Sequence, residues 1–186
     1  VGGTGLRADL AGGEVVNAGS IEAANAALAG GRVVNLGEIE IEDGSLLMVG
    51  ADAVYLRKFD DPVLIRLPRG SVGAGGTGGT DVAEAGSGEP ARYAVENHGR
   101  IEAGRGHVRL AAADPLGFSI RQGSGSAGAP ARIAAKTIEL EGGEDGRVQL
   151  SGELDASDAS KKGRGGQIDV TGSIIALVDA DLDASG

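Results

Sequence analysis

The residues in this chain best equipped for chemistry are closely spaced carboxylates. Residues two apart lie on one face of a β-strand, so such a set could supply the acid and base of a polysaccharide-cleaving site. Sites of that kind usually also offer aromatic platforms to the sugar rings, whereas the chain has two Tyr, two Phe and no Trp. We therefore interpret the carboxylates as a solvated surface and assign no catalytic residue. The sets are Asp60 with Asp61, Glu141 with Glu144 and Asp145, and Asp179 with Asp181 and Asp183.

Metal and phosphate sites have little support in the sequence. The segment GGEDG, Gly142 to Gly146, is similar to a calcium-binding solenoid turn but lacks the full nonapeptide. His98 and His107 fall at alternating positions expected to point outward, with no Cys or third His nearby, which favours a surface role over a zinc site. The basic run KKGRGG, residues 161–166, indicates an exposed loop that aids solubility or contacts an anionic sugar. No Gly-rich string has the phosphate-binding form, so we predict no metal, no cofactor and no enzymatic activity.

Composition and charge exclude several classes of partner. The 186 residues include 27 acidic and 17 basic side chains, and the formal net charge of -10 opposes binding to a nucleic-acid backbone. No apolar run approaches the roughly 18 residues of a membrane span, and the first ten residues lack the pattern of a signal peptide. We therefore interpret the chain as a segment excised from a larger protein. The absence of Cys removes disulfides and thiol chemistry.

Internal repeats decide the expected fold. The first and strongest pattern, V-x-N-x-G-x-I-E, occurs without gaps at Val15 to Ala23, Val33 to Ile41 and Val95 to Ala103. A second pattern, G-x-[VI]-x-[LV], begins at Gly106, Gly146 and Gly166, and LDAS begins at Leu154 and Leu182. A repeat of about 20 residues with loop insertions fits these spacings.

Within these units apolar and polar residues alternate, which indicates strands with one buried face. The predicted inward set is Ile39, Ile41, Leu47, Val49, Val95, Ile101, Ala103, Val108, Leu110, Ile133, Ile138, Leu140, Val148 and Leu150. The predicted outward set is Glu22, Glu40, Glu102, Arg109, Glu139, Gln149 and Asp169.

Short strands of this kind fit either an antiparallel sandwich or a coil of stacked parallel strands. Because one motif recurs near a fixed period, equivalent residues should stack in register, which favours the coil. The prediction is an all-β chain that forms one parallel β-helix, or solenoid, over residues 1–186, with Gly-rich loops projecting at 69–90 and 122–130. A short helix over Ile21 to Ala29, capped by Gly30, is an alternative for that segment.

Asn17, Asn35 and Asn97 occupy the same repeat position. Stacked amides could form a ladder along the axis of the coil, satisfying polar groups that otherwise cost about 1–3 kcal/mol each when buried. The alternative is that Asn merely favours a turn at this point. The Gly two residues after each Asn is expected at a corner that needs a positive φ or a close approach of the next coil.

These repeats resemble those of filamentous haemagglutinin-like proteins exported by two-partner secretion. The resemblance covers about Val15 to Gly186 without the two Gly-rich loops, and VVNAGSIEA, VENHGRIEAGRGHVRLAAAD, GRVQLSGELDAS and GGQIDVTGSIIALVDADLDASG carry it. It implies a right-handed β-helix, export through an outer-membrane barrel transporter, and a secreted or cell-surface adhesin of a Gram-negative bacterium. The NPNG-like motif of the family's secretion domain is absent here. Either the segment lies downstream of that domain, or the resemblance concerns the coil and not the export route.

Three functions are compatible with this interpretation. The favoured one is a structural and adhesive segment, in which the coil is a rigid spacer and the loops, especially 69–90, contact a host receptor or glycan. The second is a self-associating filament subunit whose open strand edges join end to end. The third is a β-helix enzyme that acts on polysaccharide.

Overall fold

The computed structural model describes residues 6–10, 12–57, 64–66, 93–113, 118–123, 130–143, 145–158 and 163–186. Within these residues every regular element is a β-strand, so the predicted all-β class is confirmed for the part described. The strands form a 13-stranded sheet, in which all pairings are parallel, and a separate 3-stranded sheet. The large sheet does not close on itself, an arrangement compatible with a solenoid.

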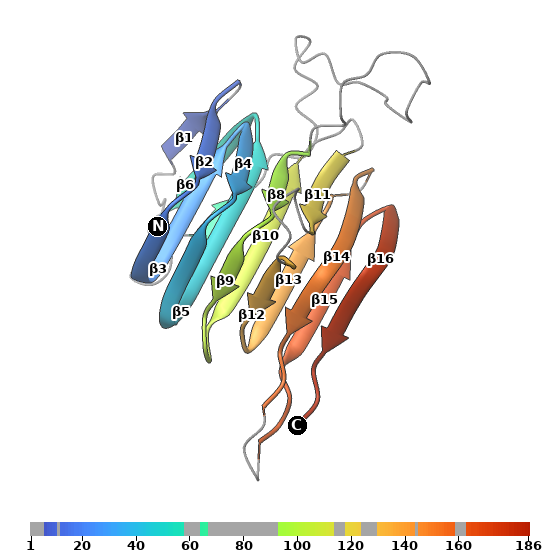
Figure 1. Ribbon diagram of the computed structural model, residues 1–186. Helices are drawn as coiled ribbons and strands as arrows, with labels where there is room; N and C mark the ends of the chain where they lie inside the picture. Colours follow the sequence, from blue (N-terminus) through green and yellow to red (C-terminus); the bar gives the residue numbers. More distant parts are fainter. Residues whose placement is uncertain are drawn as a thin grey trace, which may run out of the picture.

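The large sheet consists of three columns of stacked parallel strands. Within each column, successive strands follow one another along the molecule from the N-terminal to the C-terminal end (Figure 1). Column 1 contains β2 (Glu14–Asn17), β4 (Arg32–Asn35), β8 (Val95–Asn97), β11 (Phe118–Gln122) and the first parts of β14 (Arg147–Asp155) and β16 (Ile174–Asp183). Column 2 contains the first parts of β3 (Ser20–Gly30) and β5 (Glu38–Ala51), then β9 (Arg100–Glu102), β12 (Arg132–Ala134) and the last parts of β14 and β16. Column 3 contains the last parts of β3 and β5, then β10 (His107–Ala113), β13 (Thr137–Glu141) and β15 (Gln167–Thr171).

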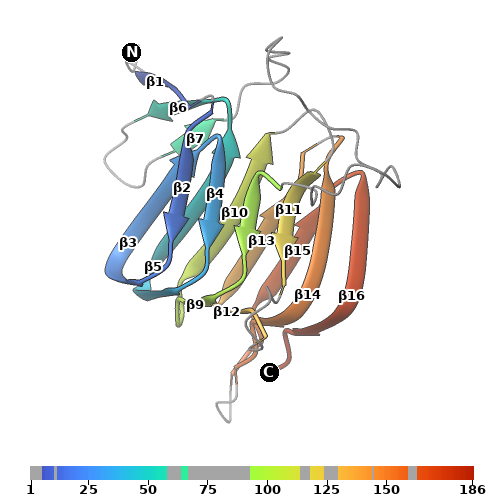
Figure 2. The same ribbon diagram turned by 45° about the horizontal axis from the view of Figure 1, so that its top comes forward.

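The chain visits the columns in turn, and one passage through them is called a rung below. In Figure 2, β2 and β4 of column 1 lie in front of β3 and β5, and β11 lies in front of β13 and β15. The first repeat motif stacks in register as expected, with Val15 paired to Val33 and Val33 to Val95. The two LDAS copies also stack, Leu154 against Leu182.

The G-x-[VI]-x-[LV] pattern is not one structural repeat. Gly106 and Gly166 directly precede β10 and β15 in column 3, whereas Gly146 directly precedes β14 in column 1. The expectation of stacked equivalents therefore holds for the copies at Gly106 and Gly166, which are in register through β13, and is wrong for the copy at Gly146. The pattern marks a Gly that directly precedes a strand of alternating residues, and such a strand start occurs in column 1 as well as in column 3.

A thin aliphatic core fills the space between the columns. The predicted inward residues are buried there with two exceptions, Leu47 and Val49, for which the prediction is wrong. Leu46 and Met48 point inward instead, because Asp43 adopts a positive φ of 53° and shifts the alternation at the corner before them. The main core consists of Val33, Ile39, Ile41, Leu46, Met48, Val95, Ile101, Ala103, Val108, Leu110, Ala112, Ile120, Ile133, Ala135, Ile138, Leu140, Val148, Leu150, Leu154 and Ala156.

A second, smaller cluster lies on the other face of column 3. There Val49 is buried with Ala51 and Ala111, and Leu10 packs against them. Beside this cluster, β1 (Leu6–Asp9), β6 (Ala53–Arg57) and β7 (Leu64–Arg66) form the antiparallel sheet, and the Leu10 N–H donates to Asp52 O at 2.7 Å. This sheet was not predicted, because its strands carry none of the repeat motifs.

Residues Ser20–Gly30 form strand β3, so the helix proposed as an alternative for this segment is wrong. Ile21 pairs with Ile39 and Leu28 pairs with Met48, so β3 supplies hydrogen-bond partners to the backbone of β5. A helix in this segment would leave those backbone groups of β5 without partners. The predicted loop at 69–90 lies outside the described residues. In the predicted loop at 122–130, Gln122 is the last residue of β11 and is buried, while 124–129 lie outside the described residues.

Candidate functional site

The amide ladder predicted from the repeats is confirmed. The Nδ2 group of Asn17 donates to Asn35 Oδ1, and Asn35 Nδ2 donates to Asn97 Oδ1, both at 2.8 Å. Asn97 Nδ2 then donates to Gln122 Oε1, also at 2.8 Å, so the ladder extends one rung further than predicted. Gln122 was missed because it is not Asn, yet Ile120-x-Gln122 repeats the V-x-N spacing.

The ladder ends at Gln122. Its Nε2 group is buried and has no hydrogen-bond partner, because the next residue in the column is Leu150. The polar stack thus gives way to an aliphatic one, which continues with Leu177. Among the described residues this is the point where the interior of column 1 changes character.

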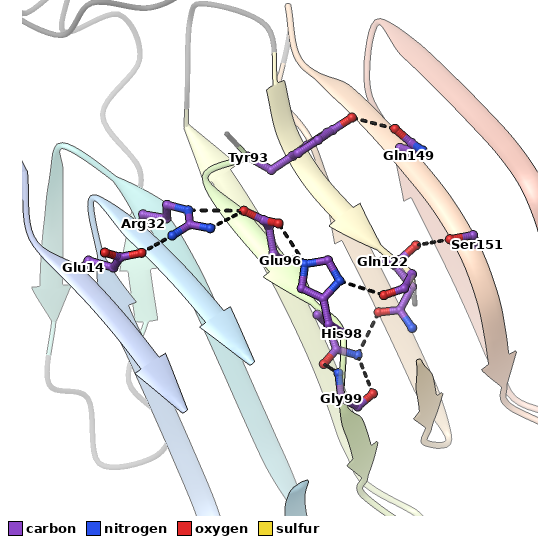
Figure 3. Close-up of polar contacts among 11 residues, drawn as sticks. Glu14, Arg32, Tyr93, Glu96, His98, Gly99, Gln122, Gln149 and Ser151 are labelled. Atoms are coloured by element: carbon purple, nitrogen blue, oxygen red, sulfur yellow. Dashed lines mark hydrogen bonds and ion pairs between the residues drawn. The ribbon is translucent and has the colours of Figure 1, made fainter. Parts of the chain in front are cut away.

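A second polar network lies on the outer side of column 1 (Figure 3). Glu96, on β8, is 5% exposed and lies between two cationic partners. Arg32 of β4 donates from Nη2 to Glu96 Oε1 at 2.6 Å, and His98 Nε2 lies 2.8 Å from Glu96 Oε2. Arg32 also pairs with Glu14 of β2, so the network spans three successive rungs.

The contacts of this network govern its ionisation. Burial by itself would raise the pKa of Glu96, but the hydrogen bonds from His98 and Arg32 outweigh it and lower that pKa below its usual value. The hydrogen bond to Glu96 raises the pKa of His98, against the opposing effect of burial. Burial would also lower the pKa of Arg32, but Glu96 and Glu14 outweigh it, so that pKa is raised. The arrangement therefore favours a carboxylate flanked by two cations.

Tyr93 covers the neighbouring part of the same surface. Its hydroxyl donates to Gln149 Oε1 at 2.6 Å, and the Arg121 guanidinium lies 5.8 Å from the centre of its ring. Burial raises the pKa of the Tyr93 hydroxyl, so it stays a neutral donor at physiological pH. Because Tyr93 reaches Gln149 across β11, it ties together rungs that are not adjacent.

The two histidines differ in their surroundings. His107 is 39% exposed and contacts Glu139 at 3.3 Å, as expected for an outward position. The expectation of a surface position is wrong for His98, whose side chain is only 12% exposed. It follows Asn97 at a corner of the coil, where the next rung places Gly123 against the imidazole ring. A sequence pattern of alternation does not reveal such cover by a neighbouring rung.

The carboxylate sets singled out in the sequence do not form a common site. Asp60, Asp61 and Glu144 lie outside the described residues. Glu141 is paired with Arg109 at 2.6 Å. Asp179 adopts a φ of 53°, which breaks the spacing of two, whereas Asp181 and Asp183 stack on Glu153 and Asp155 at the surface. Within the described part of the chain, no three His, Cys, Asp or Glu side chains are grouped so that they could hold a metal ion.

Surface hollows near these residues are shallow. One of about 400 Å³ is lined by Glu141, Gly143, Thr171, Gly172 and Ser173. Another of about 250 Å³ is lined by Glu102, Gly104, Ala134, Ala135, Asp155 and Ser157. Both lie open on the surface, and neither contains the buried network around Glu96. The chemistry available to that network is hydrogen bonding and proton binding between rungs.

The outward side chains of column 2 are largely carboxylates, and Glu40 lies in register between Glu22 and Glu102, the second of which already pairs with Arg100. Like charges directly opposite one another on paired strands are destabilising. We expect Glu40→Lys to raise the free energy of unfolding by about 0.5–1 kcal/mol, because the new cation has a carboxylate on each side. Glu40→Gln, the matched control, should give a smaller gain. Urea unfolding at low salt measures both, and a Lys variant no more stable than the Gln variant would contradict the expectation.

The Glu96–His98 pair predicts a pH dependence of stability. The raised pKa of folded His98 makes its contribution complete below the ordinary value of 6.5 and lost as pH rises through the folded pKa. The lowered pKa of folded Glu96 makes its contribution complete above 4.5 and lost as pH falls through the folded pKa. Wild type should therefore exceed His98→Gln in unfolding free energy by about 1–2 kcal/mol between these two values, with a smaller difference on the alkaline side. A difference that is constant from pH 5 to 9, on the scale of about 0.5 kcal/mol, would contradict the pairing.

None of the described residues forms a helix long and apolar enough to cross a membrane. No protein-family model matches the chain, and the comparison with curated proteins gives no match.

Proposed function

We propose that the chain is a segment of a right-handed parallel β-helix that serves as a rigid, non-catalytic stalk of a secreted or surface-displayed bacterial adhesin. The observation that carries the proposal is the stacking of the repeat motifs into three columns of parallel strands around one aliphatic core. Parallel strands joined by crossovers within one sheet are right-handed in about 98% of cases, which supports the assigned hand. The resemblance of the repeats to filamentous haemagglutinin-like proteins supports the adhesin assignment.

A stalk of this kind has two physical requirements. Its rungs must not slide past one another, and the ladder from Asn17 to Gln122 opposes a change of register because a slip would leave buried amides without partners. Its surface must stay soluble over its whole length, and the outward side chains of column 2 are largely carboxylates. In this proposal the loops between strands contact a host receptor or glycan, and a two-partner outer-membrane transporter exports the chain.

Immunolabelling of intact source cells tests the proposal. Antibody against this segment would be applied to the parent strain and to a strain that lacks the partner transporter, with a periplasmic protein as the control for leakage. Labelling of the surface or the medium that disappears without the transporter is the expected result. Signal confined to the cell interior in both strains would overturn the adhesin assignment.

A second candidate, the self-associating filament, is favoured by the state of the last rung. Among the residues that the structure describes, strand β16 pairs only with β14. Ile175, Leu177 and Leu182 are in register with fully buried core residues one rung earlier, yet they are between 40% and 60% exposed. A second copy of the chain could cover these side chains. Its strand β2 and the first part of its strand β3 have apolar inward positions and could pair in parallel with β16.

Sedimentation velocity over a range of concentrations tests this candidate. Leu177→Lys places a charge over the open end of the core and should shift the chain toward the monomer by at least about tenfold in dissociation constant. Ile174→Lys is the matched control, since Ile174 lies on the same strand and is also exposed but does not occupy an inward position. A wild-type chain that is monomeric at all concentrations, or equal loss of association in both variants, would contradict end-to-end stacking.

A further inference from the structure

His98 bridges two successive rungs through both nitrogens of its ring. Its Nε2 lies 2.8 Å from Glu96 Oε2, on the strand that directly precedes it. Its Nδ1 lies 2.8 Å from the carbonyl oxygen of Gly123, in the next rung. Both partners are oxygen acceptors with no proton of their own to offer, because the hydrogen bonds from His98 and Arg32 lower the pKa of Glu96 and keep it a carboxylate.

Only the protonated ring satisfies both contacts. An imidazolium carries an N–H on each nitrogen, whereas a neutral imidazole carries one and presents a lone pair at the other. On deprotonation the remaining proton stays toward Glu96, since a hydrogen bond to a carboxylate is stronger than one to a neutral carbonyl. The lone pair of Nδ1 then faces the Gly123 oxygen at 2.8 Å, which is a repulsive arrangement that the corner must relieve by opening.

The charged groups around the ring set the range in which this happens. Glu96 on β8 favours the cationic ring, and Arg121 on β11 opposes it. Arg32 on β4 reaches the ring only through Glu96, and its own charge is shared with Glu14 on β2. Tyr93 lies against Arg121 and stays neutral. The carboxylate is thus the nearest charge to the ring, and it stabilises the state that holds the corner closed.

The corner that His98 holds has few other fastenings among the described residues. The Gly123 N–H donates to Asn97 O at 3.0 Å, and Gln122 receives the last hydrogen bond of the amide ladder. Ser151 Oγ lies 3.4 Å from Gln122 O, a weak contact. Since the free Nε2 of Gln122 already lacks a partner, loss of the His98 contact would weaken the end of the ladder as well.

We propose that His98 is a protonation-dependent latch that fastens the corner at Gly123 to the rung of β8 and releases it when the ring loses its proton. The latch is closed on the acidic side and open on the alkaline side. It makes the stacking of two rungs sensitive to the pH of the medium, a property that a stalk built from hydrophobic stacking alone would not have.

Nuclear magnetic resonance on the full chain tests the latch. The ring nitrogens of His98 and His107 would be titrated through long-range ¹H–¹⁵N correlations, and hydrogen exchange of the Gly123 amide would be followed over the same pH range after correction for intrinsic exchange. We expect both His98 nitrogens to carry protons in acid. We also expect the protection of Gly123 to fall by about tenfold with the same midpoint as the ring titration.

Three variants separate the latch from a general effect of pH. Glu96→Gln removes the carboxylate and should move the ring titration and the exchange step together to lower pH. His98→Gln should abolish the step, whereas His107→Gln, which alters the exposed histidine, should leave it unchanged. The proposal is overturned if wild-type Gly123 shows no step, if the step survives in His98→Gln, or if Glu96→Gln moves the ring titration without moving the step.

Discussion

Asn35→Leu should lower the free energy of unfolding by about 2–3 kcal/mol. Asn35 is fully buried and makes hydrogen bonds to both neighbours in the ladder. Its removal deprives Asn17 Nδ2 and Asn97 Oδ1 of their 2.8 Å partners and leaves them the longer contacts with Glu38 O at 3.4 Å and with the Gly99 N–H at 3.3 Å. Loss of a hydrogen-bond partner at a buried polar group costs about 1–3 kcal/mol. Leu is a fair replacement for shape, because Leu150 and Leu177 occupy later positions of the same column. Equilibrium unfolding in urea, monitored by far-ultraviolet circular dichroism, measures the loss.

Gln122→Leu is the matched control for this experiment. It removes one ladder hydrogen bond but also removes the buried Nε2 group that has no partner, so the two effects offset each other. We expect a change within about 1 kcal/mol. Equal losses for Asn35→Leu and Gln122→Leu would show that the ladder does not stabilise the fold through its continuous chain of hydrogen bonds.

Gly37→Ala should lower the free energy of unfolding by about 3 kcal/mol or more. A Cβ atom at this position would lie 2.9 Å from the backbone N of Gly19 and closer still to the Gly19 carbonyl oxygen. Backbone atoms cannot move aside as a flexible side chain can, so the two rungs must separate at this corner. The φ of Gly37 is not positive, and the requirement for Gly therefore comes from the close approach of the rungs and not from backbone strain.

Gly19→Ala is the control for overpacking, since it lies one rung earlier in the same repeat position. A Cβ atom at Gly19 would meet nothing within 4 Å. We expect a change of less than about 0.5 kcal/mol, of the size usual for exposed positions. Thermal unfolding of both variants measures the contrast, and similar melting temperatures for the two would mean that the stacking distance at this corner is not limiting.

These two predictions concern the same property of the fold, the fixed distance and register between rungs. The ladder penalises a slip along the strands, and the Gly corner permits the close approach that the ladder needs. Gly99 repeats the device, because a Cβ there would meet the backbone of Gly37. A uniform spacing between rungs is what a stiff spacer requires, and it arises here from side chains of only a few types.

The sequence by itself determined the strand class, the stacking of the first motif and the ladder. Val15, Val33 and Val95 are each followed two residues later by an Asn, although the three copies lie 18 and 62 residues apart along the chain. In a parallel stack, a motif with a fixed internal spacing pairs residue for residue and so has a fixed register. The alternation of Ile101 with Glu102 likewise identified which face is buried. Such features are local or periodic, so the order of residues carries them without knowledge of the fold.

Only the tertiary structure decided the phase and the cover of particular side chains. Leu46 and Met48 point inward in place of Leu47 and Val49 because the corner at Asp43 shifts the alternation, and a one-residue shift exchanges the two faces of a strand. His98 and Glu96 occupy positions that alternation assigns to solvent, yet neighbouring rungs cover them. Their partners Arg32 and Gly123 lie 64 and 25 residues away along the chain. Contacts over such separations depend on how the insertions between rungs are accommodated, and no local pattern in the sequence encodes that.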